Sequence, residues 1–420
     1  MTRVPAIRQA RRILDSGAVV VARRHTLTPA VTAMLSFDAG SVFDPAERPG
    51  LAAFTARMID RGTPRLSADA LAEAIEQRGA TIDVTSNRQC VAISLTCLID
   101  DFQDMLTLAT DMARTPSFPD DQIELRRHET LTRIAQDAEN TAMRASARVF
   151  ERLYGDGHPY AHAPRGTAES IGALTRADLE AFHAARVRPS RLAVAVVGDI
   201  DEAEACDVVA QALSTWSDTP AAPDAIPTPT PPTTRDVSRI DVPGKAQADI
   251  AYGLLGPGRL DPEYYAFWVM NTVLGQYGLG GRLGENIRER HGMAYYASSS
   301  YDAHRIPGPL IARAGVDPSN VERALSAIDL EIDRIAREGV TRAERDAAVR
   351  FLIGSIPRMV ETNAGMAQFL IGVEQFGLGD DFDRRLPDLL SGVTHDAVNA
   401  AAASLASSRA VVAIAGPGAA

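Results

Sequence analysis

The stretch GLAAFTARMIDRGT, residues 50–63, predicts an amphipathic helix between two glycines. Ala53, Ala56 and Arg57 stand at positions i, i+3 and i+4, so their side chains share one face of that helix. A His-x-x-Glu-His motif has the same spacing and uses it to hold zinc between two imidazoles, beside a carboxylate base. The stretch therefore predicts a helix that has the spacing of a metal site and carries no metal ligand.

The composition is that of a soluble globular protein. A length of 420 residues exceeds one ordinary core and indicates two or more domains. Hydrophobic residues make up 45% and charged residues 23%, and no apolar run approaches the roughly 20 residues of a membrane span. The net charge of -11 disfavours nucleic-acid binding, which depends on Lys and Arg. A single lysine, Lys245, against 42 arginines indicates a GC-rich bacterial genome.

The cysteines and the N-terminal residues bear on the compartment. Cys90, Cys97 and Cys206 show no CxxC spacing and cannot form a disulfide framework, so we expect small buried side chains. Residues 1–17 lack the continuous apolar core of a signal peptide. We therefore expect either a cytoplasmic protein or a bacterial periplasmic one whose export signal has been removed.

A proline-rich segment divides the chain. In TPAAPDAIPTPTPPTTR, residues 219–235, seven of the seventeen residues are proline or aspartate. Such a composition predicts an extended surface linker. We predict an N-terminal domain at 1–216, a linker at 217–238 and a C-terminal domain at 239–420.

The two halves show the same order of predicted elements. Each begins with strand, continues with two helices, a strand pair and a helical hairpin, and ends on a strand that follows a helix. This order predicts an α+β fold with an internal duplication, in which each half is an antiparallel sheet covered by helices. The first half has strands at 18–25, 30–40, 80–85, 89–99 and 192–200, and helices at 50–61, 68–77, 101–114 and 119–137; the second has strands at 246–255, 294–301, 309–316 and 410–416, and helices at 263–274, 281–290, 320–337 and from 341.

Three stretches, in the right order, carry a resemblance to a known family. They are GLAAFTARMIDRGT, residues 158–201 from HPYAH to VVGDID, and GGRLGENIRERHGMAYYASSSY at 280–301. These stretches resemble segments of the pitrilysin (insulinase) family of metallopeptidases, in its mitochondrial-processing-peptidase-like branch. The resemblance covers nearly the whole chain. It implies two similar α+β halves, hinged by the linker, that close like a clamshell around a chamber for a peptide.

The resemblance also implies where the zinc ligands of that family fall. The first His falls at Ala53, the base Glu at Ala56, the second His at Arg57, and a third ligand, a Glu in the long helix, at Arg133. Alanine binds no metal, and a protonated guanidinium repels a cation. We therefore expect no metal in this chain and no peptide hydrolysis by the chain alone.

Other metal and catalytic motifs are weak. His158 and His162 have i, i+4 spacing, but Pro159 disfavours helical geometry at His158, so we predict a loop. His128 and Glu129 lie in the long predicted helix without a second histidine at i+4, and we expect a solvated face there. The sequence has no GxSxG elbow, P-loop or dinucleotide fingerprint.

Two residues of the second half match the family in register. Arg288 and Tyr295 correspond to an arginine and a tyrosine that, in the family, reach a zinc-bound substrate. The local pattern is compatible, because Arg288 ends a predicted helix, Gly292 can take the left-handed cap, and Tyr295 and Tyr296 alternate faces of the next strand. An arginine can donate to a substrate carbonyl and a phenol to an oxyanion. The structural alternative is that Arg288 complements the helix dipole and Tyr295 packs in the strand.

These features predict the non-zinc subunit of a two-chain zinc metallopeptidase. A homologous partner with His-x-x-Glu-His would supply the zinc, and this chain would supply Arg288 and Tyr295 for substrate binding and transition-state stabilisation. Two alternatives remain, a structural or assembly subunit and a peptide-binding protein that acts alone. We expect a peptide substrate, a heterodimer, no cofactor in this chain, and neither nucleic acid nor a membrane span.

Overall fold

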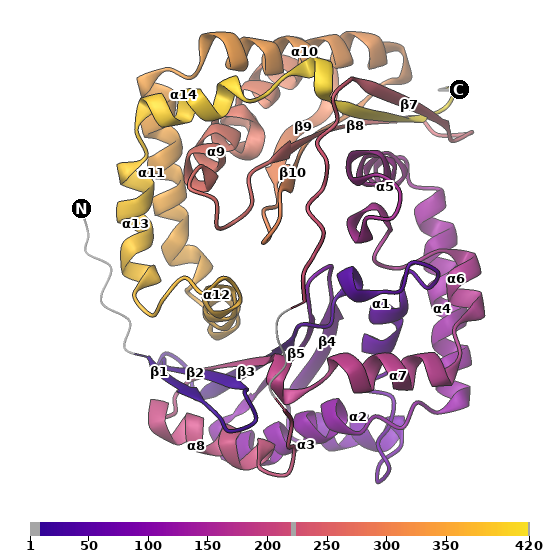
Figure 1. Cartoon of the computed structure of the whole chain (residues 1–420), viewed down its shortest axis with the longest axis vertical. Helices are drawn as coiled ribbons and strands as arrows, with labels where there is room; N and C mark the ends of the chain where they lie inside the picture. Colours follow the sequence, from indigo (N-terminus) through magenta and orange to yellow (C-terminus); the bar gives the residue numbers. More distant parts are fainter. Residues whose placement is uncertain (1–8, 220–223, 419–420) are drawn as a thin grey trace. The chain divides into compact units, whose positions relative to one another are not determined.

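The computed structural model describes residues 9–219 and 224–418, which form two compact units (Figure 1). Unit 1 consists of residues 1–134, 163–225 and 357–384, and unit 2 consists of residues 135–162, 226–356 and 385–420. Each unit contains one β-sheet. Each unit therefore combines segments from both sides of the proline-rich segment.

Unit 1 is built on a six-stranded sheet in the order β1-β2-β6-β3-β5-β4. Neighbouring strands run antiparallel, except that β2 and β6 run parallel. The central strand β3 is buried along almost its whole length, whereas the edge strand β4 alternates between exposed and half-buried residues. The strands are β1 (Ala10–Ile13), β2 (Val19–Arg24), β3 (Ala30–Phe37), β4 (Thr81–Ser86), β5 (Val91–Leu98) and β6 (Leu192–Gly198).

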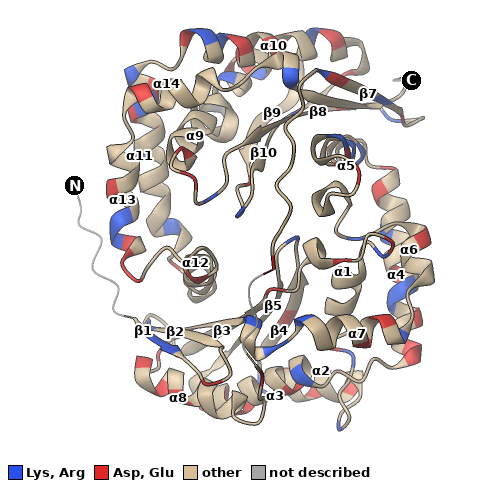
Figure 2. Ribbon diagram, in the orientation of Figure 1, with Lys and Arg blue, Asp and Glu red and all other residues tan. Residues whose placement is uncertain are grey.

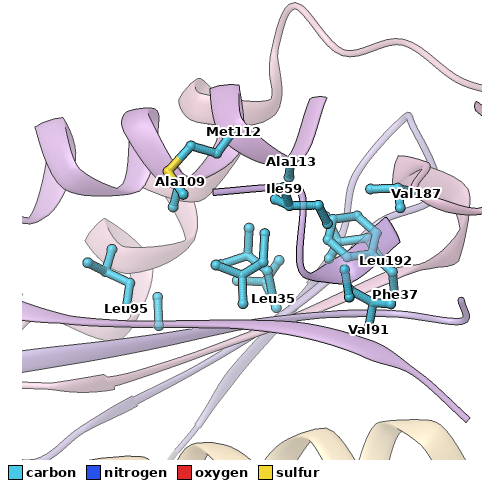
Figure 3. Packing of buried hydrophobic residues seen from close by; sticks show 14 of the residues in the cluster. Leu35, Phe37, Ile59, Val91, Leu95, Ala109, Met112, Ala113, Val187 and Leu192 are labelled. Carbon is cyan, nitrogen blue, oxygen red and sulfur yellow. The ribbon is translucent and has the colours of Figure 1, made fainter. Parts of the chain in front are cut away.

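Helices and strands of unit 1 share one hydrophobic core. Figure 3 shows Ala109 and Met112 of α3 above Leu35 of β3 and Leu95 of β5. Burial of each such large apolar side chain contributes roughly 1.5–3 kcal/mol to folding, so this core holds the helices on the sheet. The helices that contribute to it are α1 (Leu51–Ala56), α2 (Ala68–Glu76), α3 (Phe102–Arg114), α4 (Asp120–Ala138), α6 (Ala168–Ala173), α7 (Arg176–Arg186) and α8 (Glu202–Leu213). All three cysteines are buried, as expected.

A helix from the second half of the sequence also packs on this sheet. Met366 and Leu370 of α12 (Asn363–Phe376) form a second buried cluster with Val21 of β2 and Val197 of β6. Side chains on the two faces of a strand alternate, so this cluster lies on the face opposite the main core. The sheet of unit 1 is therefore covered on both faces.

Unit 2 is built on a five-stranded sheet in the order β7-β11-β8-β10-β9. Again one pair, β7 and β11, runs parallel and the others run antiparallel. A helix from the first half, α5 (Thr141–Tyr154), packs on β8 and β11; a Cβ at Gly253 would lie 2.4 Å from Val149 of α5. The elements are β7 (Asp236–Asp241), β8 (Ala248–Gly256), α9 (Tyr264–Asn271), β9 (Ala294–Tyr301), β10 (Gly308–Val316), α10 (Val321–Glu338), α11 (Arg342–Met359), α13 (Phe382–Gly392), α14 (His395–Ala403) and β11 (Val411–Gly416).

The two sheets repeat one topology, which confirms the predicted α+β fold with two similar halves. Apart from β1, the order β2-β6-β3-β5-β4 matches β7-β11-β8-β10-β9 position by position, with the parallel pair in the same place. The helices α12 and α5 contact equivalent strands, β3 and β6 in one unit and β8 and β11 in the other. We predicted antiparallel sheets, and this prediction is wrong for one strand pair in each sheet. The last strand of each half follows a helix and can therefore return parallel to the first strand. The clamshell and its chamber stay a prediction.

Three predicted helices differ in length or winding. Residues 50–61 are α-helical only over Leu51–Ala56, after which Met58 and Ile59 form tighter i→i+3 hydrogen bonds. The helix predicted at 263–274 ends in a wide π-turn at Thr272–Gln276, where a Cβ on Gly275 would lie 2.6 Å from the Ser299 nitrogen. The helix predicted at 281–290 is π-helical over Gly284–Arg290. Close packing on β9 favours the wider winding at Gly275.

The proline-rich segment is extended but partly packed. Among its described residues, none forms a helix or strand before β7 begins at Asp236; residues 220–223 lie outside the described part. Asp224 accepts hydrogen bonds from Arg186 and Arg191, both at 2.5 Å, and Pro229 is buried. The expectation of an extended segment is confirmed for the described residues, and the expectation that it lies wholly on the surface is wrong at Pro229.

Charged residues of both signs alternate on the helices. Figure 2 shows acidic and basic residues interspersed along α10 and on α4. Such mixing keeps charge dispersed, although the chain carries a net charge of -11. Within residues 9–219 and 224–418, no helix combines the length and the apolar character that crossing a bilayer requires.

Asp44 fixes the start of α1. Its carboxylate accepts hydrogen bonds from the backbone N–H groups of Gly50 at 2.7 Å and Ala52 at 2.8 Å, which would otherwise lack partners at a helix start. Gly50 has a φ of 96°, and a Cβ there would lie 2.7 Å from the Arg165 carbonyl oxygen, so the position requires glycine. Burial raises the pKa of Asp44 to about 7, although the two N–H donors favour the carboxylate.

This raised pKa predicts a pH dependence of stability. Because folding favours the protonated form of Asp44, its contribution is fully present below the unfolded-state pKa of about 4 and is lost as the pH rises through about 7. Each pH unit between these values changes the free energy of unfolding by about 1.4 kcal/mol, which amounts to about 4 kcal/mol in all.

Asp44→Asn provides the matched control, since an amide does not titrate. Trp216, which packs on Phe37 with ring centroids 6.0 Å apart, reports on unit 1 in a Trp268→Phe background. In urea unfolding followed by its fluorescence, the advantage of the wild type over Asp44→Asn should shrink between pH 4 and pH 8. A difference that stays constant across this range contradicts the prediction.

Candidate functional site

The face of α1 that carries residues 53, 56 and 57 has the helical geometry of a metal site, but it has no side chain that can bind a metal. The N–H of Arg57 bonds to the carbonyl oxygen of Ala53 at 3.2 Å, so these two residues are one helical turn apart on the same face. Ala53 is half-buried and Ala56 is buried. Neither alanine has an atom that can bind a metal or carry a proton.

Arg57 instead holds a carboxylate from α4. Its Nη2 lies 2.6 Å from Oε2 of Glu129, and Nη1 of Arg126 lies 2.5 Å from the same oxygen. The hydrogen bond from Arg126 is the main cause of a lowered pKa of Glu129, and the charge of Arg57 adds to it. Glu129 is therefore a carboxylate clamped between two guanidiniums.

Further arginines surround this pair. Burial lowers the pKa of Arg57, and the positive charges of Arg126, Arg133 and Arg165 lower it further, while Glu129 raises it. Arg165 comes close because Gly166, at a φ of 79°, packs against the turn before α1. Arg133 lies exposed one turn beyond Glu129 on α4. The four positions that the resemblance assigns to zinc chemistry thus lie in one unit, on α1 and α4.

These residues do not fit zinc. The side chains at these positions end in methyl groups and guanidiniums, and guanidiniums remain protonated even when burial lowers their pKa. Among the described residues, no group of three or more His, Cys, Asp or Glu side chains could hold a metal ion. These guanidiniums can attract an anion through their positive charge, whereas the ligand atoms of a metal site donate electron pairs to a cation.

The His158 loop is structural. His158 precedes a 3₁₀ turn at Pro159–Ala161, its Nε2 donates to the carbonyl oxygen of Pro227 at 2.9 Å, and its Nδ1 accepts from the N–H of Tyr160 at 3.1 Å. Burial lowers the pKa of His158, which favours the neutral ring. Both ring nitrogens have protein partners, as the predicted loop allows.

The segment that carries Arg288 is held in place by a hydrogen bond to α10. Asn286, two residues earlier, is buried and donates to Oε1 of Glu331 on α10 at 2.6 Å, and Glu331 also pairs with Arg334 at 2.8 Å. Gly292 has a φ of 59° and its N–H bonds to the Arg288 carbonyl oxygen, which confirms the predicted left-handed cap. The side chain of Arg288 is 45% exposed, and its Nε lies 3.7 Å from the carboxylate of its neighbour Glu289. Arg288 thus points outward from a fixed backbone.

Tyr295 and Tyr296 lie on opposite faces of β9, as the alternation predicts. Tyr295 is 63% exposed, and its hydroxyl has no hydrogen-bond partner among the described residues. Tyr296 donates to Oδ1 of the buried Asp249, while Thr141 donates to Oδ2. Burial first, and then the bond to Asp249, raise the pKa of Tyr296. The half-buried Tyr296 fixes the strand, and the exposed Tyr295 is available for a ligand.

The structure brings together some of the predicted residues and adds one. Arg288 and Tyr295 lie in unit 2 on contacting elements, the Gly284–Arg290 helix and β9. Glu129, which we expected on a solvated face, has a side chain that is 37% exposed, and it also pairs with Arg57. The spacing of Arg126, Glu129 and Arg133 places alternating charges on one face of α4, and this signal could have indicated a charged cluster there but not its partner on α1.

Comparisons with known proteins give a consistent result. A sequence profile described as "Insulinase (Peptidase family M16)" matches residues 19–167, and one described as "Peptidase M16 inactive domain" matches residues 173–352. An uncharacterized zinc protease of Mycobacterium leprae is 27% identical over 97% of this chain and 91% of that protein. Subunit 1 of the mitochondrial cytochrome b-c1 complex of Bos taurus is 28% identical over 63% of this chain and 55% of that subunit. The crystal structure of a peptidase M16 inactive domain from Pseudomonas fluorescens matches with a TM-score of 0.92 and 28% identity, over 98% of both chains.

Proposed function

Because the chain belongs to peptidase family M16, we propose that it is the non-zinc subunit of a two-chain zinc metallopeptidase. A homologous partner with an intact His-x-x-Glu-His motif supplies the zinc. This chain supplies Arg288 and Tyr295, which bind the peptide and stabilise the transition state of its hydrolysis. The chain alone is inactive.

The observation that carries this proposal is the contrast between two sets of side chains. Ala53, Ala56 and Arg57 keep the helical geometry of a metal site without any ligand atom. Arg288 and Tyr295 are exposed, on elements held by buried polar contacts below them. An exposed phenol on a strand that is fixed from its other face is available to a ligand, and this supports a role for Tyr295 in substrate binding.

The roles follow from the chemistry of the two groups. A guanidinium donates to a peptide carbonyl from a fixed fork and keeps its charge at any physiological pH. A phenol donates to the oxyanion that forms when the carbonyl is attacked, and such donors act mainly on the transition state. Both roles require exposure to a ligand, and both side chains have it.

A second candidate is a structural or assembly subunit. It is favoured by the similarity to a cytochrome b-c1 complex subunit, and by the ion pair that replaces metal chemistry at Arg57. A solitary peptide-binding protein is a third, less specific possibility that also needs no zinc.

Reconstitution distinguishes these functions. The chain is mixed with a zinc-bearing homologue of similar length from the same genome, and complex formation is followed by gel filtration. The proposal predicts a heterodimer that hydrolyses a quenched fluorescent peptide. A stable heterodimer without hydrolysis supports the structural alternative and contradicts the proposal.

A further inference from the structure

The arginines around Glu129 form a site of their own. We define the arginine cluster as Arg57 on α1 with Arg126 and Arg133 on α4; Arg165, in the loop before α6, adds its positive charge to the field at Arg57. All of these residues belong to unit 1. The cluster is therefore defined without reference to Arg288 or Tyr295 in unit 2.

The charges within the cluster do not balance. The guanidiniums of Arg57 and Arg126 pair with one carboxylate, that of Glu129, and the positive charge of Arg133 acts on Arg57, which leaves an excess of two positive charges. The neighbouring Arg61 does not change this sum, because it pairs with Asp60. Arginine keeps its charge in such surroundings, so the excess persists at all physiological pH values.

The cluster also has unused hydrogen-bond donors. Glu129 is the only hydrogen-bond partner of the Arg57 side chain within the described part of the chain, and it is reached through Nη2 alone. Nε of Arg126 is buried and has no partner there, and Arg133 has neither an ion pair nor a hydrogen bond among the described residues. The side chains of Arg57 and Glu129 remain 28% and 37% exposed, so a ligand can reach them.

We propose that the arginine cluster binds a carboxylate of a peptide, either an acidic side chain or a C-terminal carboxylate. The planar fork of a guanidinium matches a carboxylate, which takes two parallel N–H···O bonds from it. Glu129 already accepts one hydrogen bond from each of Arg57 and Arg126, on the same oxygen, which shows that these arginines hold a carboxylate. The arginine cluster thus offers positive charge to an anionic ligand at the positions where the resemblance places zinc ligands. That the ligand is a peptide rests on the proposed function; that it is an anion does not.

The internal carboxylate makes the proposal sharply testable, because it competes with the ligand. Removing a guanidinium should weaken binding, whereas removing the charge of Glu129 should free two guanidiniums and strengthen it. A site in which these arginines only support the fold would not show opposite signs for Arg133→Gln and Glu129→Gln. Arg133 is exposed, so its replacement leaves folding intact.

The test is isothermal titration calorimetry on the full-length isolated chain, without a partner. Three N-acetylated peptides of one apolar sequence are compared: one with an internal Glu and an amidated C-terminus, one with Gln and an amidated C-terminus, and one with Gln and a free C-terminus. The affinity of at least one charged peptide should exceed that of the neutral one about tenfold, since a charge-assisted hydrogen bond is gained. The peptide that gains identifies the source of the carboxylate.

Four variants complete the test. Arg57→Gln and Arg133→Gln should remove most of the tenfold preference, and Glu129→Gln should increase it. Arg65→Gln, which removes an exposed arginine paired with Asp111 elsewhere in unit 1, controls for net charge and should change nothing. Equal affinity for charged and neutral peptides, or a preference that survives both arginine variants, overturns the proposal. Inorganic phosphate that binds as tightly as the charged peptides also overturns it, in favour of a small-anion site. Because no partner is present, these outcomes are independent of whether the two-chain peptidase hydrolyses peptides.

Discussion

Replacing Tyr295 by phenylalanine is expected to lower the turnover of the reconstituted two-chain peptidase by about 10²–10³-fold, the usual effect of losing one oxyanion donor. The hydroxyl has no partner among the described residues, and the side chain is 63% exposed. Its removal therefore leaves no buried group unsatisfied, and the stability of the chain should not change. Steady-state kinetics of the pair measures the effect, with gel filtration to show that the complex persists.

Arg288→Ala should affect binding as well as rate. A guanidinium that grips a substrate carbonyl acts in the ground state and in the transition state, so KM should rise while kcat falls. The neighbouring Glu289 is only 3.7 Å away, but the pair is exposed and contributes little to stability. Turnover within about twofold of wild type for both Tyr295→Phe and Arg288→Ala would identify the pair as structural.

Tyr296→Phe is the matched control for Tyr295→Phe. The two residues are adjacent in β9, and the same hydroxyl is removed, but that of Tyr296 donates to the buried Asp249. Loss of this donor should lower the free energy of unfolding by about 1–3 kcal/mol. The folded variant should hydrolyse peptide at nearly the wild-type rate. The two substitutions thus separate a catalytic from a structural tyrosine.

Restoring ligands on α1 and α4 is expected to restore zinc binding. The wild-type chain should contain no stoichiometric zinc after chelator treatment. The quadruple variant Ala53→His, Ala56→Glu, Arg57→His and Arg133→Glu should hold about one zinc per chain, because the two histidines sit one turn apart and position 133 is where the resemblance places the third ligand. Elemental analysis of the dialysed proteins measures the difference.

A matched variant controls for chance binding by surface residues. The triple variant Ala53→His, Ala56→Glu and Arg57→His, which keeps Arg133, lacks the third ligand and should hold no stoichiometric zinc. If the quadruple variant takes up no zinc, the α1 and α4 backbones do not have the geometry of a zinc site. If the wild type retains zinc, the interpretation of the α1 face is wrong.

Elements with local signals could be predicted from the sequence. The apolar runs of β3 and β5 and the helical periodicity of α3 and α10 depend on neighbouring residues alone, and all four lie where expected. The cap at Gly292 was likewise local, because a glycine after a basic helix end permits positive φ. The repeat of these signals predicted the duplication.

Features that depend on distant partners could not be predicted. The apolar face of α5 or α12 requires a sheet, but nothing in either helix specifies which sheet it covers. The π-turn near Gly275 follows from a contact with Ser299 on β9. The parallel strand pair in each sheet depends on where the last strand inserts, which is a property of the whole half.

The candidate site likewise has features that the sequence predicts and features that depend on distant partners. The absence of ligands at Ala53, Ala56 and Arg57 was readable from residue types, and so was the alternation of Tyr295 and Tyr296. Which tyrosine is exposed depends on Asp249 and Thr141, which approach from other elements. The pairing of Arg57 with Glu129 joins residues 72 positions apart, and charge alternation on α4 alone does not reveal its partner on α1.

The most direct measurement is the rate of peptide hydrolysis by this chain, by its zinc-bearing homologue and by their mixture, at equal concentrations of each. We predict hydrolysis by the mixture, little by the homologue alone and none by this chain, with the rate saturating as this chain is titrated to equimolar amounts. Full activity of the homologue alone, unchanged when this chain is added, would contradict the proposed catalytic role.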